Sequence, residues 1–312
     1  MFDYEYWGIN TLSIKENMAL EEYMLNRSEQ NKVATVRFWN VKKDSVVLSY
    51  GEDKNSNIKR IDSTFDLTRR ITGGSHVEFD KNCMAYTFTT PRDGSFKHFD
   101  EMRKYYAERL VSALSDLGID NIYADNKAST INVNDKVIAS HAMFWGVKSA
   151  LMHGLILIDH YDVDRIYARM RLNERKIGKH IYREYDALKE APVAKEIIKL
   201  DGTYRSENEK LTYIKNKIAD AILATVTEGR HSQKQITDSI VKEAKSLVEK
   251  THAGPLWLDE REPTYTEEKV EAIPGEELAG PLKRELGYCM YIAVDNKAFK
   301  KMALPADEKN QV

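Results

Sequence analysis

The chain has 312 residues, with 47 Lys and Arg against 49 Asp and Glu, so its formal net charge is −2. This balance argues against general nucleic-acid binding, and the length suits one large domain or two modest ones. Two cysteines, the lack of a leader pattern and the lack of an apolar run of roughly 20 residues predict a reducing cytoplasmic setting without membrane attachment.

The first half of the chain alternates strands with few helices. Ser13 and Glu16 form a capping-box pattern at the start of the first helix. Gly118 is the natural stop of the clearest amphipathic helix, and Asn134-Asp135 form the bend of a hairpin. The expected elements are a helix at 13–27, strands at 34–40, 44–51, 76–79 and 84–90, a helix at 98–118, a hairpin at 128–144 and a strand at 150–159.

The second half turns helical, with expected helices at 163–171, 207–226 and 235–251. A stretch rich in proline and acid follows, and residues 288–304 have the pattern of one hairpin that turns at Asp295-Asn296. Because most strands precede this helical half, the sequence predicts the α+β class, with mixed and largely antiparallel sheets flanked by helices.

The stretch "RRITGGSHVEFD" at 69–80 places paired cations beside a turn with two glycines. Glycine is needed where φ is positive or where a ligand presses against the backbone, and exposed N–H groups in such a loop bind anions. Arg69 and Arg70 could hold a phosphate or carboxylate through paired hydrogen bonds. The simpler alternative is a hairpin turn with a solvated arginine pair. The stretch matches neither a Walker A loop nor the G-x-G-x-x-G pattern.

In its wider context this stretch resembles the lipoate–protein ligase branch of the biotin/lipoate ligase superfamily, whose signature is R-R-x-S-G-G-G-A-V-x-H-D followed by G-N-x-x-Y-S. Matching residues are Arg69, Arg70, Thr72, Gly73, Gly74, Val77, Asp80 and Tyr86, whereas Ser75 and His76 replace a glycine and an alanine. Four flanking segments resemble further family motifs in the same order: "NMALEEYML", "FWNVKKDSVVLSYGED", "INVNDKVIASHA" and "LMHGLILID".

The resemblance implies a ligase that joins lipoate and ATP into lipoyl-AMP with Mg²⁺ and then transfers the lipoyl group to a lysine of a carrier protein. Both steps need a site that positions reactants and neutralises charge. The residues that it assigns to substrate or adenylate binding are Arg69, Arg70, Thr72, Gly73, Gly74, Ser75, His76, Asp80, His141, His153 and Gly154. Asp80 either orients the loop or supports a hairpin. Basic residues near Arg175 lie where the family has its adenylate-binding loop.

The family places its catalytic lysine in the hairpin at 128–144, and the sequence leaves two registers open. In the gapless alignment Val137 occupies the lysine position, and Lys136 stands one place before it. A slip of one residue at the turn puts Lys136 there instead. Since side chains alternate along a strand, the register decides which face of the sheet Lys136 occupies. We predict that Lys136 is the catalytic lysine and points toward "RRITGG", because a turn can absorb one residue.

Three histidines accompany these motifs. His153 and Gly154 match the second histidine and the glycine of a family H-H-G-T motif, where glycine would let the strand pass close to the acyl chain. His153 is equally well explained as a satisfied core histidine. His76 and His141 are additions at motif positions that could face the pocket. No third ligand accompanies them, so we expect no metal site built from protein side chains.

Two other functions stay open. An octanoyl or lipoyl transferase of the same superfamily would need a cysteine nucleophile, and neither Cys83 nor Cys289 lies where one is expected. A non-catalytic homologue would bind lipoate or a lipoyl domain without adenylation. Pyrophosphate release from lipoate and ATP would separate a ligase from the non-catalytic homologue, and a need for ATP would separate it from the transferase.

We expect residues 1–262 to form the ligase-like catalytic domain and residues 263–312 to form a short C-terminal extension, a vestige of the accessory domain of two-domain relatives. An isolated hairpin is marginally stable, so the extension suggests a separate accessory ligase subunit as partner. The other partner implied by the resemblance is a lipoyl carrier domain, of the glycine cleavage H-protein type or the 2-oxoacid dehydrogenase E2 type.

Overall fold

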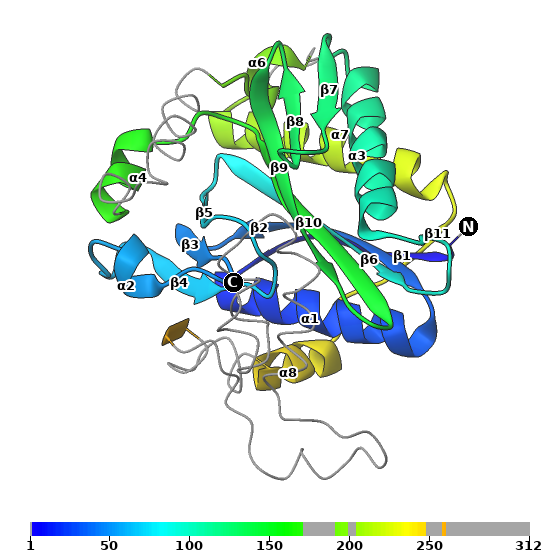
Figure 1. Ribbon diagram of the computed structural model, residues 1–312. Coiled ribbons are helices and arrows are strands. Elements are labelled where there is room, and N and C mark those ends of the chain that lie inside the picture. Colours follow the sequence, from blue (N-terminus) through cyan, green and yellow to red (C-terminus); the bar gives the residue numbers. More distant parts are fainter. Residues whose placement is uncertain (1, 171–190, 199–203, 248–257, 260–312) are drawn as a thin grey trace, which may run out of the picture.

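The computed structural model describes residues 2–170, 191–198, 204–247 and 258–259, which form two β-sheets with helices on both sides (Figure 1). The large sheet has the strand order β11-β1-β2-β6-β10-β9-β8-β7, and the small sheet has the order β4-β3-β5. From β2 to β7 neighbouring strands of the large sheet are antiparallel, whereas β1 runs parallel to β2 and β11. The predicted α+β class with mixed, largely antiparallel sheets is confirmed.

The strands are β1 (Tyr4–Leu12), β2 (Ala34–Val41), β3 (Ser45–Leu48), β4 (Asp66–Arg69), β5 (Val77–Phe79), β6 (Cys83–Pro91), β7 (Ile122–Asp125), β8 (Thr130–Val133), β9 (Lys136–Trp145), β10 (Ser149–Leu157) and β11 (His231–Gln233). The helices are α1 (Ile14–Asn31), α2 (Lys54–Asn57), α3 (Phe99–Asp116), α4 (Val163–Arg169), α6 (Ala194–Ile197), α7 (Glu207–Thr227) and α8 (Asp238–Leu247).

The large sheet is covered on both faces. Helices α3 and α7 pack on one face, here called the α3 face, whose core includes Tyr86 and Met152. Helix α1 and the small sheet lie on the other face, the α1 face, whose core includes Met18 and Leu155 (Figure 1). Because side chains alternate along a strand, His153 points to the α1 face of β10, together with Leu155. This polar residue is therefore placed between the sheet, α1 and the small sheet.

Two local signals of the sequence are confirmed. Ser13 caps α1, since its Oγ accepts a hydrogen bond from the Glu16 N–H (3.3 Å) and its own N–H donates to Glu16 Oε2 (3.0 Å). The hairpin between β8 and β9 turns at Asn134 (φ 48°) and Asp135 (φ 64°). Positive φ at both central residues is what a type I′ turn requires, and Asn and Asp tolerate it.

One expected strand is shorter than predicted, and one strand of the structure was not predicted. The strand predicted at 44–51 is the shorter β3, which pairs with β4 and β5 in the small sheet. All four residues of β3 are buried, as suits the central strand of a covered sheet. The sequence also did not predict β1, whose pairing with β2 shifts register between Tyr6 and Ile9, around Gly8 with φ 73°. Such an irregularity interrupts the period of two by which a strand is recognised.

Three expectations fall outside the described residues: the basic segment near Arg175, the hairpin at 288–304 and the domain division after residue 262. They stay predictions. Within the described part of the chain, no helix combines the length and the apolar character that crossing a membrane requires.

Candidate functional site

The glycine loop, residues 70–76, connects β4 to β5 at one end of the small sheet. A hydrogen bond from Tyr50 N to Thr72 O (2.9 Å) extends the pairing of this sheet into the loop. Gly74 and Ser75 are exposed, whereas the Thr72 side chain is fully buried. The loop thus presents bare backbone to solvent while buried side chains hold it from beneath.

Arg69, the last residue of β4, is buried, and its side chain binds backbone carbonyls of neighbouring segments. Its Nη1 donates hydrogen bonds to the carbonyl oxygens of Ser49 (2.6 Å), Tyr50 (3.1 Å) and Glu52 (2.6 Å), and its Nη2 donates to Leu258 O (2.7 Å). This guanidinium therefore fixes the segment between β3 and α2. The contact between Arg69 and a substrate stays a prediction.

Arg70 clamps the glycine loop. Its Nε donates to Thr72 Oγ1, and its Nη2 donates to Gly73 O and Ser75 O, each at 2.7 Å. Because a carbonyl and the following N–H point in opposite directions across a trans peptide, the clamp turns the Gly74 N–H away from the guanidinium. Gly74 has φ 97°, and a Cβ atom there would lie 3.2 Å from Arg70 Nη2. The clamp and the backbone conformation both favour glycine at this position.

Thr72 joins the loop to the large sheet. Its Oγ1 lies 2.8 Å from His153 Nε2, and His153 Nδ1 lies 2.7 Å from Glu21 Oε2 of α1. Burial alone would raise the pKa of Glu21, but His153, the Thr87 hydroxyl and Arg37 outweigh burial and hold this pKa below its usual value. The sequence left two roles open for His153, a core histidine with satisfied hydrogen bonds or a site residue. The structure shows a buried, hydrogen-bonded histidine that contacts the predicted loop. A contact between His153 and a substrate stays a prediction.

His76 fastens the end of the loop. Its Nδ1 lies 2.9 Å from Glu52 Oε1, while Glu52 Oε2 accepts a hydrogen bond from Ser49 N (2.9 Å). Burial alone would raise the pKa of Glu52, but His76, the Ser49 N–H and the charge of Arg70 keep it below its usual value. His76 and Arg70 therefore both act on the same buried carboxylate, that of Glu52.

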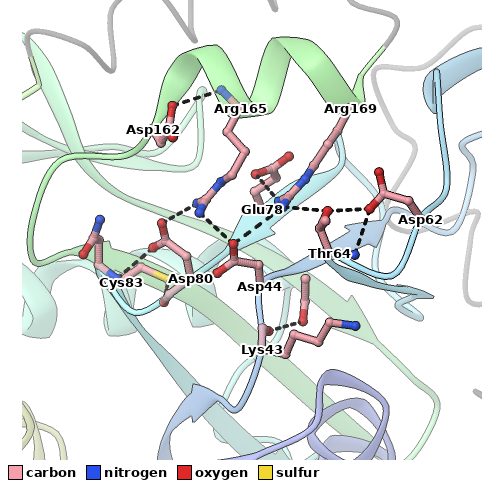
Figure 2. Close-up of polar contacts among 12 residues, drawn as sticks. Lys43, Asp44, Asp62, Thr64, Glu78, Asp80, Cys83, Asp162, Arg165 and Arg169 are labelled. Carbon is pink, nitrogen blue, oxygen red and sulfur yellow. Dashed lines mark hydrogen bonds and ion pairs between the residues drawn. The ribbon is translucent and has the colours of Figure 1, made fainter.

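Asp80 follows β5 and ties that strand to α4 (Figure 2). Its Oδ2 accepts a hydrogen bond from Arg165 Nη2 (2.7 Å), and its Oδ1 accepts one from Asn82 N (2.8 Å). Arg165 Nη1 also donates to Asp44 Oδ2 (2.6 Å). Asp80 thus both stabilises the turn after β5 and orients the strand that leaves the loop.

Three carboxylates and two guanidinium groups meet here, and we call Asp44, Glu78, Asp80, Arg165 and Arg169 the acid cluster (Figure 2). Glu78 Oε2 is 3.6 Å from Arg169 Nη1, and Arg169 Nη2 is 3.6 Å from Asp44 Oδ2. Burial raises the pKa of Glu78 to about 7, although Arg169 and Arg165 act against the rise. One member of the cluster therefore titrates near neutral pH.

Gly154 lies on the α3 face, on the opposite side of β10 from His153. A Cβ atom on Gly154 would lie 2.4 Å from Tyr86 Oη and 2.1 Å from Ser140 O. The side chain of Tyr86 thus fills the space that the glycine leaves, and packing within the protein already explains this residue. A contact between Gly154 and an acyl chain stays a prediction.

His141 is paired with Gly154 in the sheet and also faces the α3 side. Burial, and then the charge of Arg103, lower the pKa of His141 to about 3, so its imidazole is neutral at physiological pH. Within the described residues neither ring nitrogen of His141 has a hydrogen-bond partner. His141 and His76 lie on different sides of the large sheet, so the structure does not bring these two histidines together.

Lys136 is exposed at the start of β9 and pairs with Val133, whose side chain belongs to the core of the α3 face. Val137 pairs with Asn132 on the other face, which is the face of His153. The expected orientation of Lys136 toward the glycine loop is therefore wrong. The strand pairing places Val137, and not Lys136, on the α1 face, where the glycine loop lies. The catalytic role assigned to Lys136 stays untested, and its exposed place on the α3 face favours a residue outside the site.

Comparison with known protein families identifies the family to which this chain belongs. A model of the lipoyl protein ligase A/B catalytic domain matches residues 13–188, more than half of the chain. The chain belongs to the lipoyl protein ligase A/B catalytic domain family. This family member is 27% identical over 168 residues to lipoate–protein ligase 1 of Staphylococcus aureus and 25% identical over 167 residues to lipoate–protein ligase LplJ of Bacillus subtilis.

Those alignments cover 52% of this chain and 48% and 47% of the two relatives, so the chain spans about half the length of the curated relatives it matches. Solved structures give the same fold. Lipoate–protein ligase A bound with ATP aligns with TM-score 0.63 and 17% identity over 82% of this chain and 98% of its own. A bipartite lipoate protein ligase of Thermoplasma acidophilum aligns with TM-score 0.62 and 17% identity over 81% and 96%.

Two residues of this family member that hold the loop were missed in the sequence, namely Glu21 and Glu52. Acidic side chains on a helix or in a loop are usually solvated, and neither was singled out. A signal did exist for Glu21, since Asn17, Glu21, Met24 and Ser28 follow one another at helical spacing and all are buried. Polar residues on the same stripe as apolar ones indicate a buried hydrogen-bond network.

Proposed function

We propose that this protein attaches lipoate to a lysine of a lipoyl carrier protein, with ATP as co-substrate and lipoyl-AMP as intermediate. The observation that carries the proposal is the glycine loop, where Arg70 holds two carbonyls and the backbone at Gly74 and Ser75 is exposed. Exposed backbone suits an anionic ligand that must approach closely, such as the carboxylate of lipoate or the phosphate of an adenylate. Membership of the family and the names of its relatives support this choice.

Mg²⁺ is proposed to enter with the phosphates of ATP, as part of the substrate. Among the described residues, no group of three or more His, Cys, Asp or Glu side chains is placed to hold a metal ion. The proposed setting is the reducing cytoplasm, as the two cysteines of the sequence suggest.

The competing hypothesis, an octanoyl or lipoyl transferase that uses Cys83 as its nucleophile, is not favoured. The thiol of Cys83, the first residue of β6, is buried and donates a hydrogen bond to Asp80 O (3.3 Å). Burial raises the pKa of Cys83 to about 12, whereas a nucleophilic cysteine must be a thiolate near neutral pH. Cys289 lies outside the described residues.

We propose a lipoyl domain of the E2 or H-protein type as the acceptor of the lipoyl group. A separate accessory ligase subunit is the second proposed partner. One structural relative was solved as a bipartite lipoate protein ligase together with its E2 lipoyl domain. We therefore expect the chain to work faster when such a subunit is added.

The test is an assay of the full chain with lipoate, ATP, Mg²⁺ and a lipoyl domain. We expect pyrophosphate release and a mass gain of one lipoyl group on the domain. With a domain whose acceptor lysine is replaced by arginine, pyrophosphate should still form but the mass gain should vanish. A mass gain from an acyl-carrier donor without ATP would show a transferase. Binding of lipoate with no pyrophosphate release would show a non-catalytic homologue.

A further inference from the structure

A buried chain of six side chains links α1 and the large sheet to the glycine loop. We call this chain the relay. Its links are Trp39 Nε1 to Thr87 Oγ1 (3.0 Å), Thr87 Oγ1 to Glu21 Oε1 (2.7 Å), His153 Nδ1 to Glu21 Oε2 (2.7 Å), Thr72 Oγ1 to His153 Nε2 (2.8 Å) and Arg70 Nε to Thr72 Oγ1 (2.7 Å). None of the six residues is more than 6% exposed, so water does not compete for these bonds.

Proton positions on the Arg70 side follow from which groups can only donate. A guanidinium has no acceptor, so Thr72 Oγ1 must accept from Arg70 Nε. The Thr72 hydroxyl then donates to His153 Nε2, which leaves the proton of a neutral imidazole on Nδ1, facing Glu21. If His153 carried protons on both nitrogens, the Thr72 hydroxyl proton would lose its acceptor among the described residues. The neutral ring satisfies every group.

The same argument fixes the other half of the relay. The Trp39 indole N–H can only donate, so Thr87 Oγ1 accepts from it and donates its own proton to Glu21 Oε1. Both halves thus converge on the Glu21 carboxylate, which accepts from His153 and from Thr87. Glu21 is the acceptor on which both halves end, and because a carboxylate can only accept, it requires the proton of His153 to lie on Nδ1.

Within the described part of the chain Glu21 makes no hydrogen bond to the glycine loop, yet the relay that ends on it begins at the guanidinium that shapes the loop. Arg70 is fixed at Nε by Thr72 and clamps Gly73 O and Ser75 O with Nη2. If the Thr72 side chain rotated and carried Oγ1 away, Arg70 would lose the bond that orients its plane. The Gly74 N–H would then lose its fixed direction.

We propose that Glu21 is a positioning residue for adenylate formation. Its carboxylate selects the Nδ1-protonated tautomer of His153 and, through Thr72, holds Arg70 and the glycine loop in the geometry that binds the anionic substrate. The kinetic part of this proposal rests on the proposed function. The structural part, the tautomer of His153, does not depend on activity.

Nuclear magnetic resonance of protein labelled with ¹⁵N-histidine tests the structural part. The wild type should show His153 protonated on Nδ1, with a downfield proton from the bond to the carboxylate, assigned by its loss in His153→Gln. In Glu21→Gln this proton should move upfield or vanish, because an uncharged amide replaces the carboxylate. Glu22→Gln, the same change at the next position of α1, should leave it in place. A wild-type proton on Nε2, or an unchanged signal in Glu21→Gln, would overturn the proposal.

Initial rates of pyrophosphate release test the kinetic part. We expect kcat of Glu21→Gln to fall by about 10- to 100-fold, since small misplacement of binding groups has effects of this order. Glu22→Gln should keep the wild-type rate. A folded Glu21→Gln variant with the wild-type kcat would overturn the positioning role. A wild type that releases no pyrophosphate would overturn the proposed function instead, and the tautomer would still decide on the relay. If Glu21→Gln does not fold, the wild-type tautomer alone decides.

Discussion

The glycine loop and the strand that follows it are held by polar clusters of opposite design. At the Arg70 end, the relay runs in single file, and every donor has one acceptor on the way to Glu21. At Asp80, which follows β5, the acid cluster sets three carboxylates against two guanidinium groups. A single-file chain specifies geometry because each bond allows one arrangement. A crowded cluster specifies a charge balance, which changes with pH.

The difference appears in the direction of the pKa shifts. Glu21 is fully buried, yet His153, Thr87 and Arg37 keep its pKa below the usual value, so it stays a carboxylate. Glu78 is also buried, but burial wins and raises its pKa to about 7. Oε1 of Glu78 has no hydrogen-bond partner among the described residues, whereas both oxygens of Glu21 are bonded. Hydrogen bonds to the charged form account for much of this contrast.

Breaking the relay end should have the largest effect. We expect Arg70→Ala to weaken binding of a non-hydrolysable lipoyl-adenylate analogue by on the order of 2–4 kcal/mol, about 30- to 900-fold, because the loop loses its clamp and a nearby positive charge. Isothermal titration calorimetry measures this change. Arg60→Ala, whose side chain is 78% exposed, is the control and should bind as the wild type does. Unchanged affinity in a folded Arg70→Ala variant would place Arg70 outside the site.

The acid cluster should reveal itself through pH. A glutamate with a folded pKa of about 7, against 4.5 in the unfolded chain, favours the folded state below pH 4.5 and loses that contribution as pH rises through 7. The loss amounts to at most about 3 kcal/mol. Glu78→Gln keeps the uncharged shape at every pH, so its stability relative to the wild type should increase by up to that amount between acid and mildly alkaline pH.

Urea unfolding at several pH values measures this difference. The groups that face Glu78 are Arg165 and Arg169 of α4, Asp80 after β5 and Asp44 before β3. All of them are retained in the variant, so the difference isolates Glu78. Glu108→Gln, an exposed change on α3, is the control and should show no such trend. A pH-independent difference for Glu78→Gln would mean that Glu78 has the same pKa in the folded and unfolded chain, which would contradict the raised pKa.

A smaller effect is expected from removing one guanidinium of the acid cluster. Arg165→Met leaves the carboxylate of Asp80, 3% exposed, without its charged partner, and we expect a loss of about 2 kcal/mol of unfolding free energy. Arg230→Met removes an exposed ion pair to Glu228 and should cost less than about 0.5 kcal/mol. Equal stability of the two variants would show that the cluster does not tie α4 to β5.

What the sequence revealed and what it hid follow the range of the interactions. The helix cap at Ser13 and the turn at Asn134-Asp135 were predicted correctly because neighbouring residues decide them. The glycine loop was predicted from its glycines, which mark a backbone need. The relay was hidden, since Glu21 and His153 are 132 positions apart and nothing local pairs them. Alternation alone could not orient Lys136, because the face of a strand depends on pairing with its neighbour.

Lys136 sharpens the comparison because it belongs to neither cluster. The pairing of Lys136 with Val133 turns it to the α3 face, and its side chain is exposed at the hairpin. We therefore expect Lys136→Ala to change adenylate formation and transfer by less than about threefold, as is usual for an exposed residue outside a site. A catalytic lysine between the acyl carbonyl and the phosphate would instead cost about 100-fold or more on removal. Single-turnover rates of both half-reactions, measured beside Arg70→Ala, distinguish the two cases. A hundredfold loss would mean that the hairpin rearranges when substrate binds, since the pairing described here keeps Lys136 across the sheet from the loop.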